Sequence, residues 1–198
     1  MITRKRELEL IELIKKEVKP ALGCTEPIAV SLAVAKAAET LREVGLTPES
    51  AEVYVSANIL KNGMGVGVPG TGMVGLHIAA ALGITCGKSE YKLEVLKELS
   101  DNSISDAKKM LEEERINIAL AKTDLKLYIE AICYSGNHSA EAIIKDNHDS
   151  IVSVKLDDKV LFEASDNAQD SGNNAESSSK CTLDYKLNVK TIFDFAKQ

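Results

Sequence analysis

The chain has 198 residues, of which 44% are hydrophobic and 27% charged, and its formal net charge is −6 at neutral pH. These values describe an ordinary globular protein with room for one good core, or for one and a small second one. The acidic balance, the lack of a basic stripe and the scarcity of aromatic residues argue against a nucleic-acid partner. Because no apolar run suits a signal peptide or a membrane span, we expect no membrane partner and a cytoplasmic location.

Apolar residues recur at helical spacing in the first part of the chain. Leu8, Ile11 and Ile14 predict a helix over 3–19 that stops at Pro20. A second helix is expected over 26–44, after the capping residue Thr25. Alternation of apolar and polar residues then predicts a strand over 51–59. Further along, we expect a glycine-rich loop over 62–75, a short helix over 76–82 closed by Gly83, and helices at 90–99 and 104–115, the last opened by Ser103 or Ser105.

The pattern changes at Ile116. Short runs of strand composition, separated by turn residues, lie at 116–121, 125–134, 140–145, 151–156 and 160–163, with a tight hairpin tip at Asp157-Asp158. No helices lie between them, so antiparallel pairing is favoured. The sequence therefore predicts an α+β fold with a small antiparallel sheet. Residues 1–163 would form one domain, helical over 1–115 and strand-rich over 116–163. Residues 164–182 would be a flexible linker or loop, and 183–198 a terminal helix leading to an absent C-terminal half.

Cys24 lies between the first two predicted helices, in Gly23-Cys24-Thr25-Glu26-Pro27. A thiol beside a helix N-terminus lies near unpaired backbone N–H groups and the positive end of the helix dipole. Both favour the thiolate, which attacks electrophiles or binds soft metals. The alternative is a small buried cysteine with a packing role. The position favours chemistry, and we predict an accessible thiol with a lowered pKa.

Six of the thirteen residues from Gly63 to Gly75 are glycine. Such a loop allows a ligand to approach the backbone, and successive N–H groups can surround a carboxylate or phosphate. The side chains placed to help are Lys61, Asn62 and Thr71. The alternative is a glycine-rich packing turn.

Two nucleotide-binding motifs are matched only in part. Residues 70–75 fit GxGxxG, but Pro69 and further glycines precede them where a dinucleotide fold needs a strand. Residues 83–89 resemble a phosphate loop with one spacer too few, and they follow a predicted helix. We reject both.

The remaining histidines and cysteines give weaker signals. His148 precedes the apolar strand from Ile151 and is a candidate site residue, whereas His77 is interpreted as packed or surface-exposed. Asn137-His138 and Asn147-His148 repeat at an interval of ten, which indicates similar turn chemistry. Cys86, Cys133 and Cys181 are read as structural or incidental. The four cysteines have no CxxC spacing, so neither a zinc site nor a disulfide framework is indicated.

Three segments together carry a resemblance. They are 23–27, the run Asn58-Ile59-Leu60-Lys61-Asn62-Gly63-Met64-Gly65-Val66 continuing to Pro69-Gly70-Thr71-Gly72, and His148 leading into Ile151 and Val154. The chain resembles the N-terminal half of the iron–sulfur L-cysteine desulfidase family, which is related to the alpha chain of bacterial L-serine dehydratases. The resemblance covers most of residues 1–163.

The resemblance implies a cytoplasmic lyase that converts L-cysteine to pyruvate, ammonia and sulfide with a [4Fe–4S] cluster held by three cysteines. It implies Cys24 as a cluster ligand and catalytic residue, with Lys61 and His148 as further catalytic residues. An open iron could act as a Lewis acid on the leaving group. The implied substrate-binding residues are Thr25, Glu26, Asn58, Asn62, Gly70, Thr71 and Gly72.

The chain departs from that family in length. Family members are longer, and their other cluster cysteines lie in the half that is absent here, whereas a four-iron cluster needs several thiolates. We therefore expect this chain to be inactive and cluster-free alone, and to need a C-terminal half in cis or in trans. The sequence also leaves open whether the chain forms a homo-oligomer.

Other functions remain open at this point. L-serine is the alternative substrate. A non-catalytic small-carboxylate binding or regulatory module would have kept the loop and lost the chemistry. A thiol enzyme that uses Cys24 alone is the third reading, although the sequence shows no Cys–His pairing for it.

Overall fold

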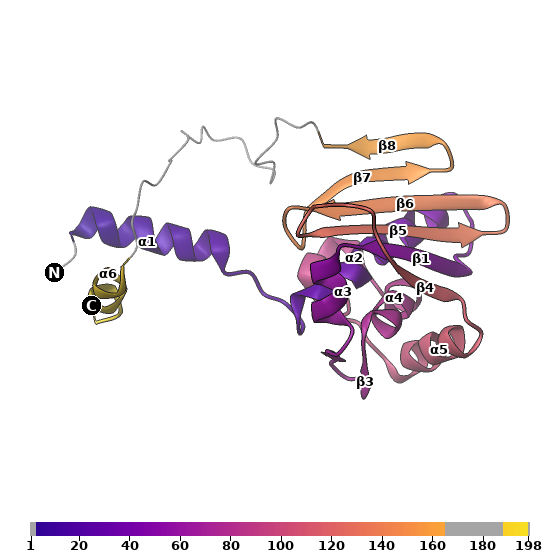
Figure 1. The fold of residues 1–198 in the computed structure, drawn as a ribbon, viewed down its shortest axis with the longest axis horizontal. Coiled ribbons are helices and arrows are strands. Elements are labelled where there is room, and N and C mark those ends of the chain that lie inside the picture. Colours follow the sequence, from indigo (N-terminus) through magenta and orange to yellow (C-terminus); the bar gives the residue numbers. More distant parts are fainter. Residues whose placement is uncertain (1–2, 165–187, 198) are drawn as a thin grey trace. The chain divides into compact units, whose positions relative to one another are not determined.

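The computed structural model describes residues 3–164 and 188–197, and the chain divides into two units. The unit Pro20–Asp166 holds every described strand and every predicted site residue. The other unit, Met1–Lys19 with Asn167–Gln198, contains the helices α1 (Arg4–Glu17) and α6 (Val189–Ala196) (Figure 1). Cys181 and nearly all of the predicted linker lie outside the described residues.

The unit Pro20–Asp166 is an α+β fold, as predicted. Its helices are α2 (Thr25–Glu43), α3 (Ala57–Gly63), α4 (Leu76–Thr85), the 3₁₀ helix η1 (Ser89–Glu94) and α5 (Asp101–Glu112). Its strands are β1 (Ser50–Val55), β2 (Gly67–Val68), β3 (Met73–Val74), β4 (Ile116–Leu120), β5 (Tyr128–Ser135), β6 (His138–Lys145), β7 (Ile151–Leu156) and β8 (Lys159–Glu163). No helix of the described residues is long and apolar enough to cross a membrane.

The main sheet has six strands in the order β4-β1-β5-β6-β7-β8. All neighbours pair antiparallel except β1 and β4, which are parallel, so the sheet is mixed. The second sheet is the antiparallel pair β2–β3. The antiparallel pairing predicted for the later strands joins β5 to β8, whereas β1 inserts between β4 and β5 and pairs with β4 in parallel.

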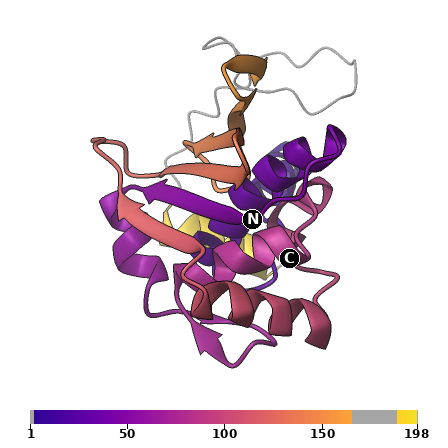
Figure 2. The same ribbon diagram turned by 90° about the vertical axis from the view of Figure 1, so that its right-hand side faces the viewer.

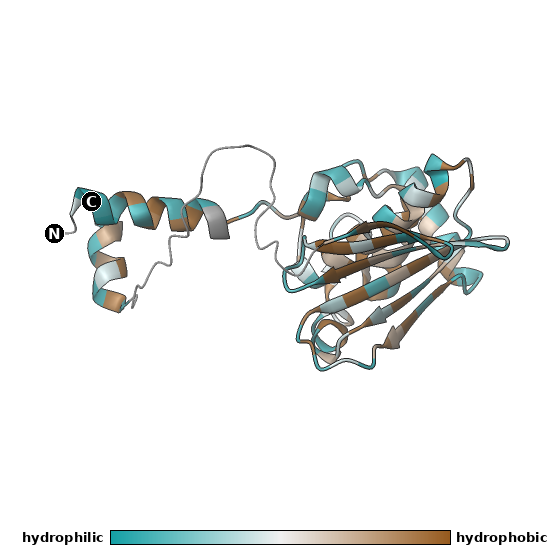
Figure 3. Ribbon diagram, turned by 90° about the horizontal axis from the view of Figure 1, so that it is seen from above, coloured by the Kyte–Doolittle hydropathy of each residue, from teal (hydrophilic) through white to brown (hydrophobic). Residues whose placement is uncertain are grey.

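Helices α2 and α4 cover one face of the main sheet (Figures 1 and 2). Alternate side chains of β1, β5 and β6, among them Val53, Ile129 and Ile144, are buried on that face. Burial of each valine or isoleucine among them stabilises the fold by about 1.5–3 kcal/mol. Figure 3 shows brown and teal residues along these strands, consistent with one packed and one partly solvated face.

Helices α2 and α4 approach each other closely at Gly83. A Cβ atom at Gly83 would lie 2.7 Å from the Ser31 carbonyl oxygen and 2.9 Å from Val34 Cβ. The Ser31 hydroxyl donates a hydrogen bond to the Ala79 carbonyl at 2.7 Å. Gly83 therefore allows helix packing and does not end the helix, so the expected stop after Leu82 was wrong and α4 continues to Thr85.

Helix α3 replaces the end of the strand that was predicted over 51–59. Ser56 is fully buried, and its hydroxyl donates to the Lys126 carbonyl and accepts from the Tyr128 N–H. This side chain ties the end of β1 to the start of β5, and the chain turns into α3 at Ala57. Alternating polarity alone could not predict the turn, because it depends on a partner about 70 residues away.

Two later helices also differ from the prediction. The segment predicted as a helix at 90–99 forms only the 3₁₀ helix η1, which is kinked at Lys92 with φ of 51°. Helix α5 begins at Asp101 because Ser100 caps it, and the Ser103 side chain completes a capping box. The helix thus starts before Ser103 and Ser105.

Candidate functional site

Cys24 is exposed and occupies the N-cap position of α2, with Thr25, Glu26 and Pro27 in the first turn. Proline is tolerated there because its missing N–H would have had no helical partner. Gly23 precedes the cysteine with φ of +108°, and a Cβ at this position would approach the Pro69 ring at 3.0 Å. Gly23 therefore allows the glycine-rich segment to pack beside the junction that presents the thiol.

The Cys24 thiol donates a hydrogen bond to the Glu26 carboxylate, with Sγ 3.1 Å from Oε2. The Thr25 hydroxyl donates to the same oxygen at 3.3 Å. Asn62 Nδ2 donates to the other oxygen, Oε1, at 3.3 Å. One carboxylate thus gathers a thiol, a hydroxyl and an amide from two helices, and we call Cys24, Thr25, Glu26 and Asn62 the thiol–carboxylate cluster.

The thiol is held in its protonated form. The hydrogen bond to Glu26, together with partial desolvation and the negative charge of Glu26, raises the pKa of Cys24 above its ordinary value of 9.0. The backbone N–H groups of Glu26 and Thr25 lower this pKa, which is the direction predicted for a helix start. The sulfur makes no capping hydrogen bond, and the effect of the Glu26 carboxylate on the pKa is larger than that of the N–H groups. The prediction of a lowered pKa and a favoured thiolate was therefore wrong.

The Glu26 carboxyl is correspondingly acidic. The hydrogen bond from Cys24 lowers its pKa most, the Asn62 amide and the positive charge of His148 lower it further, and partial desolvation opposes them. His148 lies half-buried in the connection between β6 and β7, and its positive charge acts on Glu26. His148 thus acts on Glu26 from a position more than a hundred residues further along the sequence.

Helix α3 presents its polar side chains together. Asn58, Lys61 and Asn62 are exposed, and their spacing of three and four residues places them on one face. Because Asn62 bonds to Glu26, this face adjoins the N-terminus of α2. The failure to predict α3 hid this arrangement, since the predicted strand ended at residue 59 and the predicted loop began at Asn62.

The predicted anion loop is partly a hairpin. Gly70 and Gly72 have φ of +81° and +68° between β2 and β3. Thr71 is buried, and its hydroxyl donates to the Val68 carbonyl at 2.7 Å and accepts from the Met73 N–H at 3.0 Å. These bonds use the hydroxyl within the turn, so Thr71 has a clear structural role beside its predicted binding role.

The other histidines and cysteines lie apart from the cluster interactions. His77 is half-buried on α4, and His138 Nδ1 bonds to Asp157 Oδ2 at 3.0 Å. Cys133 is fully buried, and Cys86 is half-buried at the end of α4.

The described residues do not by themselves fit a [4Fe–4S] cluster. None of them form a group of three or more His, Cys, Asp or Glu side chains that could hold a metal ion. The only cysteine of the thiol–carboxylate cluster is protonated and donates a hydrogen bond to Glu26. A four-iron cluster needs several thiolates, so Cys24 would have to be joined by ligands from outside the described part of the chain.

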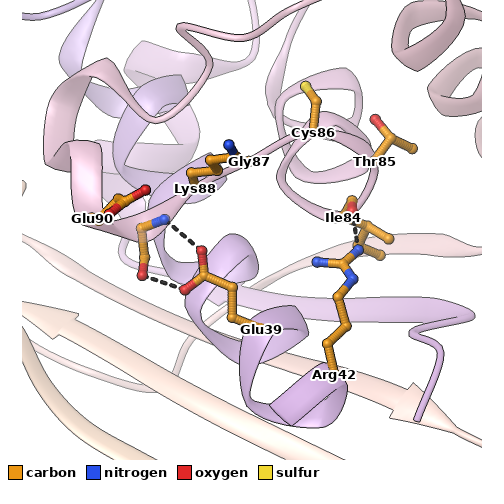
Figure 4. Close-up of a pocket in the computed structure, with 9 residues that line it drawn as sticks. Glu39, Arg42, Ile84, Thr85, Cys86, Gly87, Lys88 and Glu90 are labelled. Atoms are coloured by element: carbon orange, nitrogen blue, oxygen red, sulfur yellow. Dashed lines mark hydrogen bonds between the residues drawn. The ribbon is translucent and has the colours of Figure 1, made fainter. Parts of the chain in front are cut away.

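A pocket of about 560 Å³ lies at the C-terminal end of α4 (Figure 4). Its lining residues include Glu39, Arg42, Cys86 and Lys88. Glu39 and Arg42 lie within the predicted helix over 26–44, where no motif marks them as site residues. Their polar groups are used locally: Glu39 accepts hydrogen bonds from the Ser89 N–H and hydroxyl, and Arg42 donates to the Ile84 carbonyl. We place the candidate site at the thiol–carboxylate cluster, because its exposed thiol and amide and its half-buried carboxylate combine acid, base and amide functions.

Comparison with known proteins adds relatives but no reaction. The chain is 49% identical over 198 residues to a UPF0597 protein of Bacteroides thetaiotaomicron, covering 99% of this chain and 43% of that protein. UPF0597 proteins of Phocaeicola vulgatus and Clostridium perfringens are 46% and 40% identical, and the matches cover 99% and 98% of this chain and 43% and 42% of theirs. The chain therefore spans less than half the length of these relatives. No family model matches the sequence. No solved structure matches it either.

These relatives correct the resemblance drawn from the motifs. Their similarity runs along nearly the whole of this chain, and they bear the UPF0597 name. The identification of the chain as the N-terminal half of an iron–sulfur L-cysteine desulfidase, related to the L-serine dehydratase alpha chain, is therefore wrong. The name of the relatives states no reaction, so a function has to be argued from the site.

Proposed function

We propose that this chain supplies part of the active site of a lyase that removes a β-substituent from a small amino acid, L-cysteine or alternatively L-serine. The observation that supports it is the gathering of a thiol, a carboxylate and an amide at one exposed point. The rest of the catalytic centre, including any iron–sulfur cluster, would come from a further polypeptide segment in cis or in trans.

A free amino acid is a zwitterion, and the cluster offers a partner for each charge. Glu26, whose lowered pKa keeps it ionised, would accept hydrogen bonds from the substrate ammonium group. Asn62 and Lys61 on the exposed face of α3 would donate to the substrate carboxylate. Asn58 lies on the same face and would extend this contact.

Elimination needs a proton acceptor at Cα and a proton donor at the leaving group. In this proposal His148, in its neutral form, takes the Cα proton on a ring nitrogen, the released electron pair forms the Cα–Cβ double bond, and the bond from Cβ to sulfur or oxygen breaks. The departing group takes the proton of the Cys24 thiol, whose raised pKa keeps that proton in place at neutral pH. The aminoacrylate product would tautomerise and hydrolyse to pyruvate and ammonia.

The test is turnover with and without the missing part. The chain would be combined with the remaining part of the Bacteroides thetaiotaomicron relative under anaerobic conditions, and iron and sulfide would be added. Pyruvate release from L-cysteine and from L-serine would then be measured. We expect pyruvate only in the mixture, and its loss with Cys24→Ser but not with the matched variant Cys86→Ser. Equal activity of the Cys24→Ser mixture would contradict the proposal.

A non-catalytic module that binds small carboxylates is the second candidate. It is favoured by the lack of a metal-holding group among residues 3–164 and 188–197. Calorimetry distinguishes the two. Binding of L-serine that depends on Asn62, without pyruvate in the mixture, would favour the module.

A further inference from the structure

The surface around the thiol–carboxylate cluster is incomplete as a binding site for a small molecule. Cys24 and Asn62 are exposed, and Glu26 is half-buried. A small-molecule site in a protein usually buries most of its ligand, and such sites often lie where two domains meet. A substrate held by these groups alone would remain largely in water, where its charges and hydrogen bonds interact more weakly with the protein.

The glycine-rich segment beside the cluster has backbone that the described residues leave uncovered. Gly65 follows Asn62 by three residues, and both Gly65 and Gly67 are exposed. A Cβ atom built at either glycine would meet no described atom within 4 Å. Neither glycine has a positive φ. Contacts and conformation within this unit therefore give no reason for glycine at these two positions, whereas glycine allows another segment to pack directly on the backbone.

Three apolar side chains that flank the cluster are also exposed. Leu22, Met64 and Val74 are 37%, 40% and 63% exposed. Leu22 lies two residues before Cys24, and Met64 lies two residues after Asn62. Val74 belongs to β3, which pairs with β2 in the glycine-rich segment. Exposed apolar side chains that gather beside a polar site favour association with another protein surface.

Close contacts hold these segments side by side. A Cβ atom at Gly23 would lie 3.0 Å from the Pro69 ring, so the junction before α2 packs against the glycine-rich segment. A Cβ atom at Gly75 would lie 3.0 Å from the Met64 carbonyl oxygen, so the end of β3 lies beside the end of α3. Helix α3 in turn contacts α2 (Figure 1). We call the uncovered glycines and exposed apolar residues of this region the loop surface: Leu22, Met64, Gly65, Gly67 and Val74.

We propose that the loop surface is the docking site for the part of the longer polypeptide that the relatives have and this chain lacks. This chain matches only 43% of each of two relatives, so they carry enough further chain to cover the surface. The inference rests on the proposed function, in which a further segment completes the site. That segment would pack apolar residues on Leu22, Met64 and Val74 and lie against the backbone at Gly65 and Gly67. It would thereby cover the thiol–carboxylate cluster and exclude water from the substrate.

Alkylation of Cys24 measures whether the cluster is covered. In a chimera, this chain would replace its matching region in the Bacteroides thetaiotaomicron relative, and iron-free protein without substrate would be exposed briefly to iodoacetamide. We expect Cys24 to react roughly tenfold or more slowly in the chimera than in the 198-residue chain, because a covered, desolvated thiol forms less thiolate. The rate at Cys86 should be the same in both proteins. Since neither iron nor turnover is involved, docking is tested apart from the lyase reaction.

Variants of the chimera locate the docking site. Val74→Asp places a charge on the loop surface and should restore fast alkylation of Cys24. Val160→Asp, the matched change at a valine of β8 that is 47% exposed, should not restore it. Gly67→Val should act like Val74→Asp, because its side chain would project into the docked segment. In the isolated chain all three variants should leave the rate at Cys24 unchanged, with circular dichroism as the check on folding.

Equal reactivity of Cys24 in the chimera and in the isolated chain would overturn the proposal. An effect of Val160→Asp without one of Val74→Asp and Gly67→Val would also overturn it. Alkylation of Cys24 that slows in the isolated chain only at high protein concentration would assign the loop surface to a second copy instead. If Cys24 is covered in the chimera but Cys24→Ser leaves pyruvate formation unchanged, the docking site stands and the proposed function fails.

Discussion

Two cysteines lie at helix ends in this protein, and the residues around them differ. Cys24 occupies the N-cap position of α2, is exposed, and donates a hydrogen bond to the Glu26 carboxylate. Cys86 caps the C-terminus of α4, is half-buried, and points its thiol at the Leu82 carbonyl at 3.5 Å. Both thiols have raised pKa values, but the leading cause is the hydrogen bond to Glu26 for Cys24 and desolvation for Cys86.

The comparison shows that a helix end alone does not determine the chemistry of a thiol. The N-terminal dipole favours a thiolate at Cys24, yet one carboxylate two residues further along outweighs it. A thiol held protonated by a carboxylate can give up its proton when a substrate displaces that carboxylate. A thiol that is protonated by burial, as at Cys86, has no such partner to exchange.

The largest expected effect is on turnover. In the proposed lyase, Cys24→Ser removes the proton donor and should lower pyruvate formation in the reconstituted mixture by about 10²–10⁴-fold. Cys86→Ser should change it little, because a hydroxyl can make the same bond to Leu82. Comparable losses of pyruvate formation in the two variants would contradict a catalytic role that Cys24 has and Cys86 lacks.

The next effect is on stability, and it distinguishes a glycine in the α2–α4 contact from a glycine in the loop after α3. Gly83→Ala forces a Cβ against Ser31 and Val34 and should lower the free energy of unfolding by about 1–3 kcal/mol. Gly65→Ala has open space and no positive φ, so it should change stability by less than about 0.5 kcal/mol. Urea denaturation of both variants gives the comparison. A neutral Gly83→Ala would contradict the close α2–α4 packing.

A smaller effect is on thiol reactivity. Glu26→Gln removes the charge that raises the pKa of Cys24, so alkylation of this cysteine at pH 7 should become several-fold faster. Glu39→Gln, beside the other cysteine, is the control and should leave the rate at Cys24 unaltered. Mass spectrometry after brief exposure to iodoacetamide measures each site. A slower reaction in Glu26→Gln would show that the carboxylate assists the thiolate.

The smallest effect is the pH dependence of stability. The lowered pKa of Glu26 contributes stability that is present above its ordinary value of 4.5 and is lost as pH falls through the folded-state pKa. The raised pKa of Cys24 contributes stability that is present below 9.0 and is lost as pH rises through the folded-state pKa. The stability difference between wild type and Glu26→Gln should therefore be greatest between these limits. Urea unfolding across pH tests this, and a flat difference would argue against the bond.

Much of the fold could be predicted from local patterns. The periodicity of α2, the strands from β5 to β8 and the turn at Asp157-Asp158 are all local signals, and the structure contains each of them. The parallel pairing of β1 with β4 was not predictable, because their paired residues lie about 65 positions apart in the sequence. The start of α3 depends on Ser56 and its bonds to the β5 region, which no window of sequence contains.

The site was predictable in composition but not in chemistry. Cys24, Glu26 and Asn62 were all candidates from motifs, and the structure brings them together. The bond between Cys24 and Glu26 reversed the expected pKa, although their separation of two residues at a helix start was a usable signal. The approach of His148 could not be inferred, since it depends on how the β6–β7 connection is placed beside α2.

The most direct measurement is an NMR titration of the isotope-labelled 198-residue chain with L-serine, following the backbone amides. We predict that the shifts concentrate at Thr25, Glu26 and Asn62 and disappear in Asn62→Ala, while the amides of Cys86 and Ser89 stay unchanged. Shifts confined to the pocket of Cys86 and Ser89, or none at saturating ligand, would contradict the assignment of the functional site to the thiol–carboxylate cluster.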